Sequence, residues 1–251
     1  VDPARSAVAL YTFSERGGSY ICSGGLIADD DATGRPLFLT ANHCVSKGRA
    51  ANSVEAFWDY DTPCGGSCER AWANGSGVAS SNGAQILATN RTSDYTVLEL
   101  TGPLPGTRTF LGVDSAPVAF NNGQALYRIS HPAGSPQSYS QHDVDTTKGT
   151  CTSWPRGDWI YSRDMEGATE GGSSGSPVLN AAGNVVGQLS GACGFNVNDN
   201  CDADSNATVD GAIAAYYSDI AAILAGNDGG GDGGGGGGSK PCNPNSPKCN
   251  P

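Results

Sequence analysis

This sequence lacks long apolar segments and is poor in basic residues. No hydrophobic run approaches the roughly 18 residues that a membrane-spanning helix needs, so we expect no membrane partner. Lys and Arg number 14 against 25 Asp and Glu, and the resulting net charge of −11 argues against a nucleic-acid partner. A basic-then-apolar leader is also missing from the first residues, as in a chain whose signal and pro-segment have been removed.

Zinc-type CxxC spacing is absent too, although the chain has nine cysteines. Cysteine in this pattern indicates disulfides and an oxidising, extracellular compartment, so we expect a secreted protein. The expected pairs are Cys22–Cys44, Cys64–Cys68 and Cys242–Cys249. Among Cys151, Cys193 and Cys201 one is left without a partner, and the sequence leaves open which one.

The hydrophobic pattern predicts a mostly β chain. A Pro- and Gly-rich segment at 101–117 reads as a linker between two β halves, and apolar residues from Ile213 to Leu224 recur at helical spacing before Gly226. Residues 226–240 read as a flexible Gly-rich linker, and 241–251 as a Cys-containing tail. The expected strands are 7–13, 19–28, 53–60, 69–79, 84–89, 123–130, 138–146, 158–163, 176–180 and 184–190, with a further strand running into His43.

The most informative stretch is Glu170-Gly-Gly-Ser-Ser-Gly-Ser-Pro-Val178. It places Ser174 on a glycine-rich turn just before an apolar strand. A nucleophilic serine needs such a turn, because its hydroxyl must stand clear of the backbone while neighbouring N–H groups point at the same spot. The backbone N–H groups of Gly172 and Ser174 are the candidate oxyanion donors.

Two further residues complete a catalytic set. His43 follows a strand beside Cys44, and Asp94 stands at the head of an alternating strand. Acyl transfer by serine needs a base for the hydroxyl proton and an anion that orients this base. The order His, Asp, Ser differs from the Ser, Asp, His order of α/β-hydrolases, and a subtilisin-type order would need an aspartate before His43 in an α/β chain.

These motifs resemble the trypsin/chymotrypsin-like serine peptidase family. ICSGGLI, LTANHC, SDYTVLEL and GSSGSPV look like its cysteine, histidine, aspartate and serine motifs. SHPAG, EGGSSGSPV and GQLSG are most similar to secreted bacterial lysyl and glutamyl endopeptidases. The resemblance covers roughly residues 7–225. It implies a peptidase domain at 1–225, built from two six-stranded antiparallel Greek-key β-barrels (about 7–105 and 115–225) with a short C-terminal helix.

The same resemblance implies a specificity pocket. Its base falls on Ala168, the next wall residue is Thr169, its facing walls fall on Leu189, Ser190, Gly191 and Ala192, and its back on Thr208 and Val209. The strand Ser190–Ala192 would pair with the substrate backbone. A charged side chain left unpaired in an uncharged pocket is costly, so we expect small or apolar residues before the cut. The rival alignment turns Asp210 into the pocket and predicts Lys or Arg.

The sequence thus predicts a monomeric secreted serine endopeptidase acting on protein or peptide substrates, without a cofactor or metal. Two other functions remain open: an inactive trypsin-like binding module, and an esterase or lipase with a similar triad. Asp202, Asp204 and Asn206 have the spacing of the first ligands of a calcium loop. They lack its glycine and distal glutamate. His131 and His142 are interpreted as structural.

Overall fold

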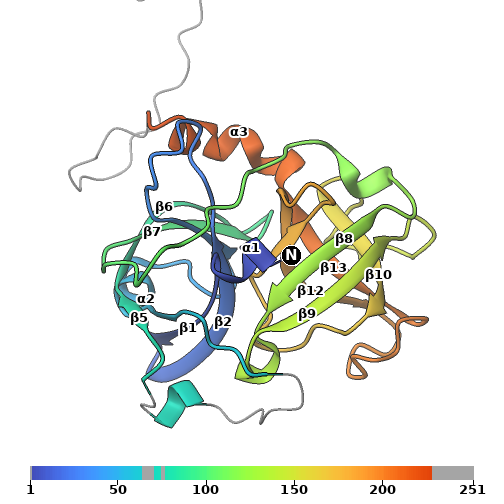
Figure 1. Cartoon of the computed structure of the whole chain (residues 1–251). Coiled ribbons are helices and arrows are strands. Elements are labelled where there is room, and N and C mark those ends of the chain that lie inside the picture. The colour runs from blue at the N-terminus through green and yellow to red at the C-terminus, as the bar shows by residue number, and fades with distance from the viewer. Residues whose placement is uncertain (1, 64–70, 75–76, 228–251) are drawn as a thin grey trace, which may run out of the picture.

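The computed structural model describes residues 2–63, 71–74 and 77–227. Two β units lie side by side, and the helix α3 (Ile213–Leu224) lies across one end of the molecule (Figure 1). The order of elements therefore follows the predicted plan of two β halves and a closing helix.

The first unit is an antiparallel seven-stranded sheet with the order β5-β4-β1-β2-β3-β7-β6. The inner strand β3, which lies between β2 and β7, is buried at every position. The strands are β1 (Val8–Glu15), β2 (Gly18–Leu26), β3 (Leu37–Ala41), β4 (Glu55–Phe57), β5 (Ser80–Asn82), β6 (Ala84–Asn90) and β7 (Tyr95–Leu100).

A closed six-stranded first barrel was expected, and the observed curled sheet of seven strands corrects that expectation. The reason is a bend at Gly83, whose φ of +82° is readily adopted by glycine. The bend divides one length of extended chain into β5 and β6, which lie at opposite edges of the sheet. The two edges meet through Gly83, which donates to Val54 O (2.7 Å) and accepts from Thr101 N (3.0 Å).

The second unit is a closed six-stranded barrel, as predicted, with the order β10-β13-β12-β11-β8-β9. The sequence prediction omitted one of its strands, β13, because every residue of β13 is buried and no polar alternation marks it. The barrel consists of β8 (Ala125–Ser130), β9 (Ser138–Val144), β10 (Trp159–Glu166), β11 (Pro177–Leu179), β12 (Val185–Gly194) and β13 (Asn206–Ala212).

The predicted terminal helix is present as α3, which buries Ile213, Tyr216, Ile220, Ile223 and Leu224. Gly226, at φ +67°, ends it. The remaining helical turns are α1 (Asp2–Arg5), α2 (Gly48–Asn52), η1 (Ala71–Asn74), η2 (Val118–Phe120) and η3 (Pro132–Gly134). Where a strand was expected at 69–79, the described residues are the turn η1 and residues 77–79, which form no strand. Across the described ranges, no helix has the length and apolarity to cross a membrane.

One hydrophobic cluster joins the two units. It fills the first sheet, covers the inner face of α3 and includes Ile129, Leu179 and Val185 of the barrel. The predicted linker between the halves is extended and bridges both, since Leu111 pairs with Ile27 and Val113 with Val185. The shared core holds the units in one fixed arrangement around the site between them.

Two disulfides lie within the described residues. Cys22–Cys44 joins β2 to the turn after β3, as expected, and Cys151–Cys193 resolves the pairing that the sequence left open. Cys201 is exposed and has no disulfide partner among the described residues. The expected pairs Cys64–Cys68 and Cys242–Cys249 fall outside the described residues.

We predict that replacing Cys22 and Cys44 together by serine lowers the free energy of unfolding. The bond spans a sequence separation of 22, and closing such a loop restricts the unfolded chain by about 3 kcal/mol. Urea unfolding of the oxidised protein and the double variant measures the difference. An unchanged midpoint would contradict the prediction.

Candidate active site

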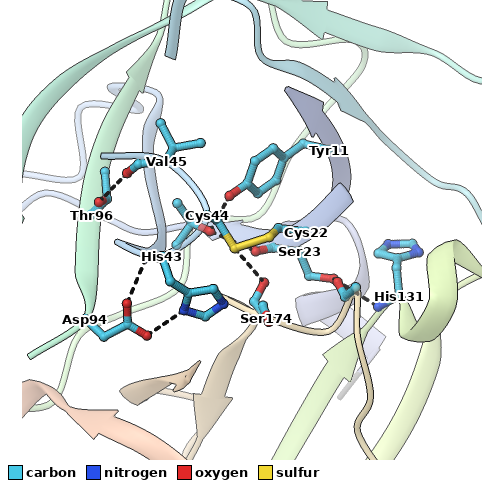
Figure 2. Close-up of a disulfide and its surroundings, with 12 residues drawn as sticks. Tyr11, Cys22, Ser23, His43, Cys44, Val45, Asp94, Thr96, His131 and Ser174 are labelled. Carbon is cyan, nitrogen blue, oxygen red and sulfur yellow. Dashed lines mark hydrogen bonds and ion pairs between the residues drawn. A yellow bond between two sulfur atoms is a disulfide. The ribbon is translucent and has the colours of Figure 1, made fainter. Parts of the chain in front are cut away.

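His43 lies on a tight turn that follows β3 (Figure 2). Cys44 N–H donates to Ala41 O (3.2 Å), and Thr96 on β7 donates through Oγ1 to Val45 O (2.7 Å). The Cys22–Cys44 disulfide fastens the same turn to β2. The imidazole is therefore carried by a turn that is held from both neighbouring strands, and its ring remains 43% exposed.

Asp94 immediately precedes β7 and adopts the left-handed conformation, with φ +51°. Its carboxylate makes two contacts with His43. Oδ1 accepts a hydrogen bond from the backbone N–H at 2.8 Å, and Oδ2 lies 2.7 Å from ring Nδ1. An ionised carboxylate only accepts hydrogen bonds, so the ring proton belongs on Nδ1. Nε2 is then left with the free lone pair that a general base requires.

Ser174 lies in the loop between β10 and β11, wedged against the first sheet. Gly175 has φ +80°, and a Cβ there would lie 2.1 Å from Thr40 Oγ1 and 2.6 Å from Ser23 O. Only glycine allows this approach. The Ser174 carbonyl accepts the N–H of Ser23 at 2.9 Å and lies 3.9 Å from Cys44 Sγ.

These contacts bring Ser174 beside the histidine turn. In Figure 2 the His43 ring lies between Asp94 and Ser174. The neighbouring serines are excluded by burial, because Ser173 and Ser176 have no exposed surface whereas Ser174 is half-buried. The structure thus brings the three predicted residues together and leaves one accessible serine.

Two backbone N–H groups of the serine loop are free. Ala133 N–H binds the Gly171 carbonyl (2.7 Å), and Ser176 N–H binds the Ser173 carbonyl (3.0 Å). Because a trans peptide points its C=O and N–H in opposite directions, these bonds turn the next two N–H groups, of Gly172 and Ser174, away from them. Within the described chain neither of the two donates to a backbone carbonyl. Both can therefore receive an anionic oxygen.

The sequence reading did not identify what supports this loop, the turn at His131. His131 N–H donates to Ser23 Oγ (3.0 Å), and Ser23 Oγ–H donates to Gly172 O (2.8 Å). The ring is buried and its Nδ1 lies 2.9 Å from Ser135 O, so His131 is structural, as predicted. The SHPAG motif was the signal available in the sequence. Its connection to the serine loop runs through residues that are distant in the sequence, so the motif alone does not reveal it.

A cavity of about 190 Å³ opens beside Ser174. Of the predicted pocket residues, Thr169, Leu189, Gly191 and Ala192 line it, together with Glu170, Gly171, Val197 and Asn200. Thr208 lines a smaller cavity of about 20 Å³ that shares some of these walls. Ser190 lines the wider cleft that contains His43 and Asp94. Ala168 and Val209 line neither cavity, and Val209 packs with Trp159, Tyr161, Cys193 and Ala207 in a separate hydrophobic cluster.

Asp210 lies away from the pocket, so the interpretation that it reads a basic substrate side chain is wrong. Its side chain has no exposed surface, and Oδ1 lies 2.5 Å from the Arg128 guanidinium. The same guanidinium donates to Ser176 O (3.0 Å) and Ser176 Oγ (3.1 Å). This buried pair secures the strand that follows the serine loop.

The sequence reading missed an acidic group in the smaller cavity. Asp164 and Asp202 both line it. Asp164 Oδ1 accepts from Thr208 Oγ1 (2.7 Å) and lies 2.7 Å from Nδ1 of the buried His142. Burial acts to raise the pKa of Asp164, but the His142 and Thr208 hydrogen bonds hold it below its usual value, so the carboxylate is ionised near neutral pH. Asp164 stands two residues after the buried Ser162 on β10, so the two side chains face the same side of the strand. This spacing was the signal available in the sequence.

Among the described residues, no group of three or more His, Cys, Asp or Glu side chains could hold a metal ion.

Comparison with known proteins matches a family model to most of this chain. The model of the lysyl endopeptidase C-terminal domain matches residues 1–207. A lysyl endopeptidase of Pseudomonas aeruginosa is 35% identical over 196 residues, which cover 76% of this chain and 40% of that protein. The chain therefore spans well under half the length of this relative.

Solved structures share the fold. The active form of the Rv3671c protease of M. tuberculosis aligns with a TM-score of 0.59 at 15% identity, covering 87% of this chain and 81% of that one. An inactivated protease paralogue of the scabies mite aligns with a TM-score of 0.61 at 13% identity, covering 88% and 95%. Active and inactivated proteins both have this fold, so the fold by itself implies no activity.

We predict a pH-dependent loss of stability that comes from His131. Burial lowers its pKa from 6.5 to about 4, although the Ser135 carbonyl acts in the opposite direction. Between these values the unfolded chain binds a proton that the folded chain does not. The free energy of unfolding therefore falls as the pH falls, by roughly 3 kcal/mol over the whole window.

The measurement is urea unfolding at pH 7 and pH 4.5, for the wild type and for His131→Gln. The other titrating groups are common to both proteins, so the variant should lose less stability than the wild type over this interval. Equal losses would show that His131 does not contribute.

Proposed function

We propose, from the premise that this chain belongs to the lysyl endopeptidase C-terminal-domain family of serine endopeptidases, that it hydrolyses peptide bonds in extracellular proteins. The family membership follows from the match over most of the chain. The activity rests on the site geometry, and the extracellular location on the two disulfides, which form and persist in oxidising compartments. We assign the peptidase unit to residues 1–225 and treat it as a monomer.

Ser174 is the proposed nucleophile. Its Oγ attacks the carbonyl carbon of the scissile bond while His43 Nε2 takes the hydroxyl proton. His43 then gives this proton to the leaving amine nitrogen as the C–N bond breaks, which leaves an acyl-enzyme ester. Water, deprotonated by His43 in turn, hydrolyses the ester and releases the acid product with Ser174 restored.

Asp94 and the serine loop stabilise the charges that develop. The carboxylate of Asp94 holds the tautomer with Nδ1–H and stabilises the imidazolium. The free N–H groups of Gly172 and Ser174 are the proposed oxyanion donors, and losing one such donor typically slows turnover by about 10²–10³.

The paired hydrogen bonds between Asp94 and His43 are the observation that carries this proposal. An inactive binding module has no use for a histidine that is oriented by a carboxylate and exposed beside an accessible serine. An esterase could use the same triad, so hydrolysis of casein against a short-chain ester separates the two activities.

We expect Ser174→Ala to reduce casein hydrolysis by roughly 10⁶-fold, because removing the nucleophile of a triad abolishes covalent catalysis. Ser218→Ala, an exposed change on α3, is the matched control and should retain full activity. A fluorophosphonate reagent should label Ser174, as located by peptide mass mapping. Labelling of the buried Ser173 or Ser176 instead would refute the assignment.

For the residue before the cut, we propose a basic side chain bound through Asp164. Next to Ser174 the predicted pocket residues Thr169, Leu189 and Ala192 carry no charge, and Glu170 also lines this cavity. The adjoining smaller cavity nevertheless contains the Asp164 carboxylate, 14% exposed. The similarity to the P. aeruginosa lysyl endopeptidase supports the same preference.

We predict that Asp164→Asn lowers kcat/KM for a chromogenic peptide ending in Lys by at least about tenfold, since a cation left unpaired in the pocket is poorly solvated. Peptides ending in Ala or Leu should change little. Asp204→Asn removes an acidic group that lines neither cavity and serves as the control. Wild-type preference for Ala or Leu over Lys would support the neutral pocket expected from the sequence.

A further inference from the structure

We infer that Gln188 and Tyr216 are positioning residues that hold Asp94 in place from the six-stranded barrel and from α3. The inference rests on the proposed function, because it concerns how the triad carboxylate is aimed. It adds two buried side chains that do not contact the reacting atoms.

Gln188 lies on β12 and has no exposed surface. Its amide crosses from the barrel to the turn that carries the triad aspartate. Nε2 lies 3.2 Å from Ser93 O and 3.2 Å from Asp94 O, so its two hydrogens serve two carbonyls. These carbonyls belong to the peptide groups on either side of the Asp94 Cα. Holding both groups sets the direction in which the carboxylate points.

The neighbouring strand leaves a passage for this side chain. A Cβ at position 211 would lie 2.3 Å from Gln188 Nε2 and 2.6 Å from Ser93 O. Gly211 pairs directly with Gln188 in the barrel. The absence of a side chain at Gly211 therefore lets the amide reach the aspartate turn.

Tyr216 completes the arrangement from α3. Its hydroxyl donates to Gln188 Oε1, which fixes the amide orientation that directs Nε2 at the turn. Its ring stacks on Tyr95, the residue after Asp94, with centroids 4.1 Å apart. The Tyr95 hydroxyl in turn donates to Asp219 Oδ2 on α3 (3.2 Å). Helix α3 thus holds both Gln188 and the segment that contains the triad aspartate.

This support maintains the backbone conformation and the position of Asp94. Asp94 has a left-handed backbone, which for a non-glycine residue persists only where surrounding contacts maintain it. Asp94 also belongs to the first sheet, whereas Ser174 belongs to the second unit. A hydrogen bond from β12 fixes the position of the Asp94 carboxylate relative to Ser174, and not only relative to its own sheet.

The test compares Gln188→Met, which removes the donors at similar size, and Tyr216→Phe, which removes only the hydroxyl. Tyr217→Phe is the matched control, because Tyr217 lies on the same helix and its hydroxyl makes no hydrogen bond to a described residue. We expect kcat to fall about tenfold in Gln188→Met, with KM nearly unchanged, because misplacing a catalytic group by about 1 Å can cost up to 100-fold. Tyr216→Phe should show a smaller fall in the same direction.

The pH profile separates positioning from general destabilisation. The Asp94 carboxylate favours the protonated imidazole, so a displaced carboxylate moves the acid limb of the kcat/KM profile to lower pH. A purely structural role would lower the melting temperature and leave this limb in place.

Proton NMR gives a readout that requires no turnover. The Nδ1–H protons in the His43–Asp94 and His142–Asp164 hydrogen bonds should both resonate far downfield, and Asp94→Asn assigns the first. Gln188→Met and Tyr216→Phe should shift or broaden the His43 signal and leave the His142 signal unchanged. The inference is overturned if both folded variants keep the wild-type His43 signal and pH profile. If the wild type cleaves no peptide, the proposed function fails while this signal still tests the positioning.

Discussion

The site depends on the contact between the serine loop and the first sheet. Ser174 comes from one β unit and His43 and Asp94 from the other, so no catalytic geometry exists unless the two units meet in register. The Ser23 N–H bond to the Ser174 carbonyl sets this register, and Gly175 permits it by having no side chain. The shared hydrophobic cluster then maintains the approach, because separating the units would expose its apolar surface to water.

Buried polar groups around this contact have distinct functions. The Arg128–Asp210 pair is buried inside the barrel, where it anchors the strand after Ser174. The Asp164–His142 pair is built in the same way but reaches the small cavity, so its carboxylate is accessible from that cavity. Both pairs satisfy the rule that buried charge is partnered. This difference in access is the reason that the proposed specificity involves Asp164 rather than Asp210.

Several features could be anticipated from residue order because they depend on local chemistry. The three triad residues each stand at a strand end with distinctive flanks, and the terminal helix has a clear apolar spacing. The strand β13 and the pocket residue Asp164 were not anticipated. A strand buried on both faces shows no alternation, and the acidity of a pocket depends on which distant strands line it.

The sequence alone determined the chemistry on offer: a serine on a glycine turn, a histidine beside a cysteine, and an aspartate at a strand head, in an order typical of one family. These are short-range patterns, imposed by the dihedral freedom of glycine and by strand periodicity. Only the tertiary structure decided which carboxylate faces the pocket, which is sealed by Arg128, and how Gln188 reaches Asp94. Those outcomes depend on side chains nearly a hundred residues apart meeting across the barrel wall, and periodicity contains no information about such contacts.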